Sequence, residues 1–213
     1  MFLLIQACAM IIVTVDNIVI TQKLGPEAVT QYAVPMRMFM VVRSLASMFV
    51  IPLWPAYSEA LARGDAGWVK RTAVRSVVLT VLIFSPLVVG FVILGKPIVH
   101  VWVGPQIHPS FLLLWGAAVW VVVDLCGNAV GIFLMGANRL KFLVIGYAAA
   151  AVAVLPAKVY CARAFGIAGV VWATAVITAL GTVASVLYAA HVLRQIQTAS
   201  SPCREAGDAT AKA

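Results

Sequence analysis

Charged residues are scarce in this sequence. Only 10% of its 213 residues are Asp, Glu, Lys or Arg, and no more than seven are acidic. Hydrophobic residues make up 63% of the chain. A soluble domain cannot cover its surface with so few charges, so soluble enzymes and nucleic-acid-binding proteins are nearly excluded. We therefore interpret the net charge of +8 as that of a membrane protein and not as a sign of nucleic-acid binding.

Motifs that carry catalysis or nucleotide binding are also missing from the sequence. It contains no HExxH, no GxSxG and no glycine-rich phosphate-binding loop. The four cysteines form no CxxC pair, so neither a disulfide framework nor a metal site is expected. We therefore predict a protein that is not an enzyme, with no catalytic residues, no cofactor and no metal.

Long apolar runs fill most of the chain. A helix needs roughly 20 residues to cross the hydrocarbon of a bilayer. Backbone groups in lipid must be hydrogen-bonded internally, which favours helices here over barrel strands. We predict an all-α integral membrane protein with about six transmembrane helices in one bundle over residues 1–194. The predicted spans are about 1–22, 33–56, 73–95, 110–136, 141–163 and 167–193, and a disordered tail follows at 195–213.

Basic residues are distributed unevenly between the two sets of loops. One set, with the C-terminal tail, holds Arg63, Lys70, Arg71, Arg75, Arg139, Lys141, Arg194, Arg204 and Lys212. The other set holds Lys23, Lys96, Lys158 and Arg163. The richer set is expected to face the cytoplasm, because basic residues are retained there. Both termini are then cytoplasmic, and the cluster at 70–75 could also touch anionic lipid headgroups.

Charged side chains inside the first two spans are candidates for function, because charge within a membrane is costly. Asp16 and Asn17 either line a polar cavity, or Asp16 is a buried structural hydrogen-bonding group. Arg37 and Arg43 could bind phosphates through their guanidinium groups. Alternatively, Arg37 extends to water and Arg43 forms an internal ion pair, with Asp16 or with Asp124.

The fourth predicted span carries a second polar group. Asp124, Gly127, Asn128 and Gly131 share one helical face because they are three or four residues apart. This face could form a wall of a translocation path, with Asp124 as a proton-linked group. It could instead be a packing seam of small residues, with Asp124 and Asn128 hydrogen-bonding between helices.

Three groups of segments resemble one protein family. The segments are DNIVI at 16–20 with KLGPEAV at 23–29 and YAV at 32–34; PLWPAYSEA at 52–60 with RGD at 63–65; and LMGANR at 134–139 with GIAGV at 166–170. In this order and spacing they resemble the polysaccharide or O-antigen flippases of the multidrug/oligosaccharidyl-lipid/polysaccharide exporter superfamily. The resemblance covers about residues 10–190.

This resemblance implies a transporter of the bacterial cytoplasmic membrane. Such proteins have two six-helix halves around a central cavity that opens alternately to either side, and they move undecaprenyl-pyrophosphate-linked glycans between leaflets. The chain resembles the C-terminal half of this fold of twelve or more helices, so we expect a missing N-terminal half or a second copy. Two alternatives remain: a multidrug cation antiporter of the same superfamily, against which Arg43 argues, and a non-transporting scaffold subunit of an export system.

Overall fold

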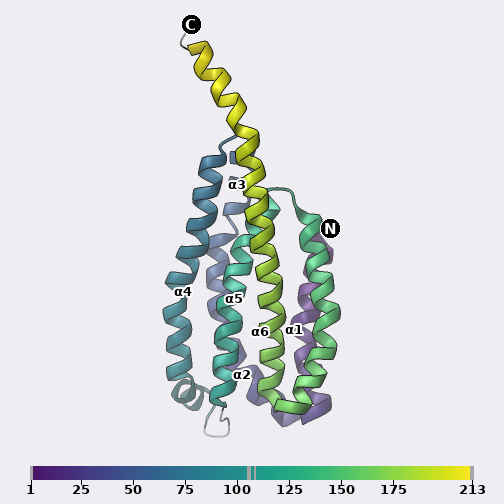
Figure 1. The fold of residues 1–213 in the computed structure, drawn as a ribbon. Coiled ribbons are helices and arrows are strands. Elements are labelled where there is room, and N and C mark those ends of the chain that lie inside the picture. The colour runs from purple at the N-terminus through teal and green to yellow at the C-terminus, as the bar shows by residue number, and fades with distance from the viewer. Residues whose placement is uncertain (1, 105–106, 108, 212–213) are drawn as a thin grey trace.

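In the computed structural model, residues 2–104, 107 and 109–211 are described. The helices are α1 (Phe2–Leu24), α2 (Pro26–Val50), α3 (Leu53–Ala62), α4 (Ala66–Val103), α5 (Phe111–Gly136) and α6 (Leu140–Ala211). The long helices lie side by side about one axis, and the short α3 lies at one end (Figure 1). These residues contain no strand, so the predicted all-α fold class is confirmed.

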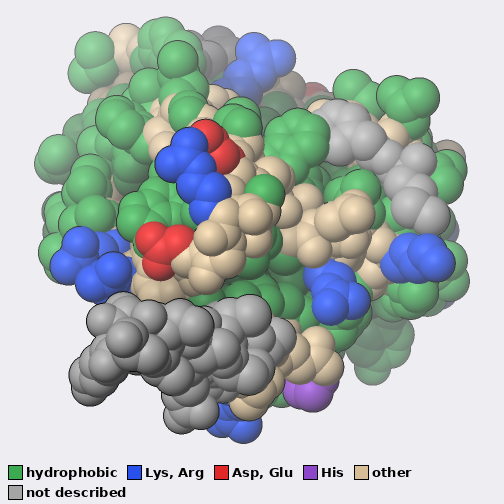
Figure 2. All heavy atoms as spheres, turned by 90° about the horizontal axis from the view of Figure 1, so that it is seen from above, with side chains coloured by type: hydrophobic (Ala, Val, Ile, Leu, Met, Phe, Trp, Pro, Cys, Tyr) green, Lys and Arg blue, Asp and Glu red, His purple; other side chains and the backbone are tan. Residues whose placement is uncertain are grey.

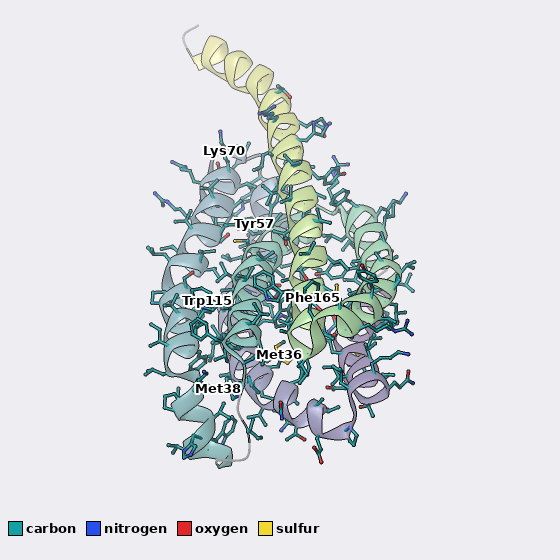
Figure 3. All side chains as sticks on the ribbon, turned by 60° about the horizontal axis from the view of Figure 1, so that its bottom comes forward. Met36, Met38, Tyr57, Lys70, Trp115 and Phe165 are labelled. Atoms are coloured by element: carbon teal, nitrogen blue, oxygen red, sulfur yellow. The ribbon has the colours of Figure 1, made fainter. Side chains whose placement is uncertain are left out.

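Helix α6 consists of two limbs that meet at Gly166. The backbone there has φ 63° and ψ −145°, a conformation that glycine adopts without the steric penalty of a side chain. The first limb (140–165) and the second limb (167–211) run side by side in opposite directions, and Phe165 lies at the bend (Figures 1 and 3).

Within the described part of the chain, five helical stretches are long and apolar enough to cross a membrane. They are Leu3–Leu24, Pro26–Ala62, Ala66–Trp102, Phe111–Gly136 and Leu140–Ile196. Because the last one folds back at Gly166, it contains both of the spans predicted at 141–163 and 167–193.

The end of α6 differs from the sequence-based expectation of a disordered tail. The helix continues to Ala211, and its last part leaves the bundle (Figure 1). A single unpacked helix of this length is only marginally stable in water. Disorder of the tail at 195–213 therefore stays a prediction for the protein in solution.

Helix α3 closes one end of the bundle. Two prolines near the end of the second span predict a helix break, and α2 does end at Val50 before α3 begins at Leu53. Tyr57 of α3 is fully buried, and its hydroxyl lies 3.2 Å from Ser76 Oγ of α4. Ser58 Oγ donates to the Gly136 carbonyl at 3.1 Å. These contacts fasten α3 to α4 and to the end of α5.

Two of the apolar clusters in the described interior meet along α5. One contains Phe39, Leu114 and Leu125, and the other contains Tyr57 and Phe133 near α3. Along α5, Leu125 belongs to the first cluster and Ala129 belongs to the second. The polar segment that contains Asp124 and Asn128 therefore lies where the two clusters meet, away from both ends of α5.

Candidate functional site

A partly open cavity of about 150 Å³ lies between the helices of the bundle. Its walls come from α1, α5 and both limbs of α6, and Arg43 reaches it from α2. The polar side chains on these walls include Arg43, Asp124, Asn128, Thr178, Thr182 and Ser185. A concave pocket with a few converging polar groups is the usual form of a small-molecule site, and we take it as the candidate site.

Two polar links join α2 to α5 at the cavity. Arg43 Nε donates to Asp124 Oδ2 at 2.6 Å, and Asn128 Nδ2 donates to Ser47 Oγ at 3.2 Å. Both links connect residues 81 positions apart, so α2 and α5 run parallel and the links are one helical turn apart. Of the two acids considered from the sequence, the structure places Asp124 beside Arg43.

The Arg43 side chain remains partly available despite this ion pair. It is 42% exposed, against 18% for Asp124. Asp124 engages Nε, and within the described part of the chain the two terminal nitrogens of Arg43 have no hydrogen-bond partner. A guanidinium anchored in this way keeps a pair of donors free, with the fork geometry that matches a phosphate or carboxylate group.

A row of hydroxyl groups on the second limb of α6 forms the facing wall. Thr174, Thr178, Thr182 and Ser185 follow one another at steps of four, four and three residues, so they share one face and all line the cavity. The sequence interpretation missed this row. The spacing places these hydroxyl groups on one helical face. Hydroxyl groups are common in transmembrane helices, however, and only the structure shows what this face contacts.

Glycines determine how closely the cavity walls approach. A Cβ at Gly127 would lie 2.6 Å from Thr182 Oγ1, so α5 and the second limb of α6 pack tightly at this point. At Gly146 and Gly181 nothing lies within 4 Å, so these two glycines leave space in the cavity. Of the predicted small-residue seam, Gly127 approaches α6 closely, whereas nothing lies within 4 Å of a Cβ at Gly131.

We expect Gly127→Ala to destabilise the protein by about 1–3 kcal/mol, because the new methyl group overpacks against Thr182. Thermal unfolding in detergent would measure this loss. The double variant Gly127→Ala/Thr182→Ala should recover most of it, since the overlapping hydroxyl is gone. Equal destabilisation of the single and double variants would contradict this contact.

Asp16 lies outside the cavity wall, in a buried cluster. It is only 3% exposed; Tyr32 Oη donates to its Oδ2 at 2.6 Å, and Lys158 Nζ forms an ion pair with its Oδ1. Lys158 is fully buried and also donates to the Ile12 carbonyl at 2.6 Å. Its assignment to an outer loop was wrong, because it lies within the first limb of α6 and faces the bundle interior.

The Asp16 cluster is next to the cavity. Ile12, whose carbonyl accepts from Lys158, also lines the cavity wall. Trp120 and Thr174 line both the cavity and a small void of about 10 Å³ that borders Asp16. These two side chains therefore separate the ion pair from the cavity, and they are the only described residues shared by the two spaces.

Asn17 and Arg37 are not brought to the cavity. Both side chains are exposed on the outside of the bundle. On α1, exposed polar side chains recur at helical spacing and form one stripe, namely Gln6, Thr14, Asn17 and Thr21. On α2, Ser44 lies seven residues after Arg37 on the same face and is also exposed. Each of the two helices thus presents polar groups on an outer face at membrane depth.

Comparison with known proteins identifies the family. A family model described as "Polysaccharide biosynthesis protein" matches residues 1–112, which is more than half of the chain. The chain belongs to this family. The matched region contains α1 to α4, with Asp16 and Arg43, whereas Asp124 and both limbs of α6 lie beyond it.

A curated relative supports the same assignment. Lipid II flippase MurJ of Bacillus subtilis (strain 168) is 28% identical over 156 residues, which are 71% of this chain. The match spans only 28% of the length of that relative. No solved structure matches the chain. The chain is thus a member of the polysaccharide biosynthesis protein family with helices of transmembrane length, and part of it is similar to a lipid II flippase.

Proposed function

We propose that this chain is part of a flippase that moves a lipid-linked oligosaccharide or polysaccharide precursor across the cytoplasmic membrane by alternating access. The observation that carries the proposal is Arg43, which is anchored to Asp124 at the cavity with its terminal nitrogens free. The family match and the similarity to a lipid II flippase support it.

The chemistry of the cavity is suited to a phosphate-linked sugar. Moving such a headgroup through hydrocarbon is costly because its polar groups lose water without gaining partners. Hydroxyl and amide groups on the walls can replace part of that water, and Arg43 can bind the diphosphate. In this role Asp124 orients the guanidinium and does not bind the substrate.

The ion pairs weigh against the multidrug cation antiporter. A cationic drug needs a free buried acid as its counter-charge. Among the described residues, Asp124 is paired with Arg43 and Asp16 is paired with Lys158. The membrane-embedded acids of this bundle therefore already have cationic partners.

A second bundle is part of the proposal. A cavity of about 150 Å³ is too small for a whole oligosaccharide, so the path must include other surfaces. The exposed polar stripes that contain Asn17 and Arg37 would be costly against lipid and are suited to a water-filled path. Either a preceding six-helix half or a second copy of the chain would face these stripes.

We propose that both termini are cytoplasmic, in a bacterial inner membrane. Seen from the end that carries α3, exposed Lys and Arg side chains surround the bundle (Figure 2). The loops at this end contain Arg63 and Arg139, and the second limb of α6 carries Arg194. A basic end of this kind is retained on the cytoplasmic side.

Replacement of Arg43 tests the proposal. Arg43→Gln should weaken binding of a polyprenyl-diphosphate saccharide by about 10- to 100-fold, because hydrogen bonds to a charged group contribute roughly 1.5–3 kcal/mol. Arg43→Lys should retain part of the affinity, since it keeps the charge and loses the fork geometry. Binding would be measured with the detergent-solubilised protein, and transport with a fluorescent lipid-linked saccharide in proteoliposomes.

Arg63→Gln is the matched control, because Arg63 is exposed, pairs with Glu59 on α3 and lies away from the cavity. It should leave binding and transport unchanged. Unaltered binding and transport in Arg43→Gln would overturn the site, whereas absence of saccharide transport by the wild-type protein would favour the scaffold subunit. Uptake of a quaternary ammonium compound without saccharide transport would favour the antiporter.

A further inference from the structure

One face of α4 combines two arginines with a long apolar stripe. Arg71, Arg75, Val78, Leu82, Val89 and Ile93 recur at steps that keep them on one side of the helix, and all six are exposed. Among the candidate spans, α4 is also the least buried, with 22% of its apolar window inside the protein. The stripe therefore faces the surroundings of the bundle along most of its length.

The uncharged length of α4 places these arginines at the membrane surface. Residues 76–95 carry no Asp, Glu, Lys or Arg, and Arg75 and Lys96 flank them. Twenty helical residues extend about 30 Å, which equals the thickness of the bilayer hydrocarbon. Arg75 and Arg71 then lie at the level of the lipid headgroups, at the same end of α4 as Lys70 (Figure 3).

The two arginines lack a counter-charge within the described residues. Like charges four residues apart on a helix repel each other. The nearest acids along the chain are already engaged, since Glu59 pairs with Arg63 and Asp65 caps the start of α4 by accepting from the Trp68 amide. Nothing in the described structure offers an anion to Arg71 or Arg75.

We propose that this stripe is a binding site for one anionic phospholipid of the cytoplasmic leaflet. Its phosphate lies between the guanidinium groups of Arg71 and Arg75. Its acyl chain follows the apolar stripe past Val78 and Leu82. Two arginines at one point provide a local site for phosphate, beyond the general attraction of a basic protein surface to anionic lipid.

Native mass spectrometry of the purified full chain tests this site. Phosphatidylglycerol and phosphatidylcholine would be titrated separately, and the apparent Kd for the first bound lipid measured. Wild type should prefer phosphatidylglycerol. Arg71→Ala/Arg75→Ala should weaken that binding by about 30-fold, because each basic residue near an anionic surface contributes roughly 1 kcal/mol. Arg71→Lys/Arg75→Lys should retain most of the affinity.

Arg139→Ala/Lys141→Ala is the matched control, since it removes two exposed basic side chains at the same end of the bundle. It should leave the first phosphatidylglycerol site intact. Equal weakening in both double-alanine variants would overturn the site, because it would show diffuse attraction only. Equal affinity of wild type for the two lipids, or competition by millimolar inorganic phosphate, would also overturn it.

Discussion

Lys158→Ala should destabilise the protein by about 3–5 kcal/mol, the cost of leaving one member of a buried ion pair without its partner. Lys158 is fully buried, and Asp16 is nearly so. The substitution would leave Asp16 with Tyr32 as its remaining partner and would remove the hydrogen bond from Lys158 to the Ile12 carbonyl. The loss should appear as unfolding at a lower fraction of SDS in mixed micelles, monitored by tryptophan fluorescence.

Removing both charges together should be less harmful than removing one. In Asp16→Asn/Lys158→Met the buried groups are neutral and similar in size, and such replacements of buried ion pairs are often nearly neutral. The double variant should therefore be more stable than Lys158→Ala. Lys96→Ala, at an exposed position on α4, is the control and should change stability by less than about 0.5 kcal/mol. A double variant no more stable than Lys158→Ala would contradict the pairing.

Gly169→Ala should destabilise the hairpin of α6 by about 3 kcal/mol, which is the upper end of the usual cost of overpacking a protein interior. A Cβ at Gly169 would overlap the carbonyl oxygen of Cys161 and lie 2.8 Å from its carbonyl carbon. These are backbone atoms, so no side-chain rotation can relieve the clash, and the two limbs have to separate. The same SDS unfolding measurement would report the loss.

Gly181→Ala serves as the control for Gly169→Ala. It lies on the same limb and has no atom within 4 Å of the new methyl group, so the change in stability should be less than about 0.5 kcal/mol. Similar losses in the two variants would show that the effect comes from glycine itself and not from the close approach of the limbs.

The sequence by itself determined the fold class, and it showed which charged residues lie within membrane-spanning segments. Apolar runs of transmembrane length predict the helices, since no other regular structure except a closed barrel satisfies the backbone in lipid. Arg43 and Asp124 are visible as charges inside such runs, and Asp124 was one of the two ion-pair partners considered for Arg43. The gap between the predicted spans 141–163 and 167–193 predicts that the chain reverses there, and the bend lies at Gly166.

Only the tertiary structure decided which faces of the helices meet. In a soluble helix the apolar side marks the interior, but lipid is as apolar as the core, so periodicity says little about which side packs inward. The sequence could not show that Lys158 reaches Asp16 or that the hydroxyl row of α6 faces Arg43 across a cavity. These partners are far apart along the chain, and packing of α6 against α1 and α5 brings them together.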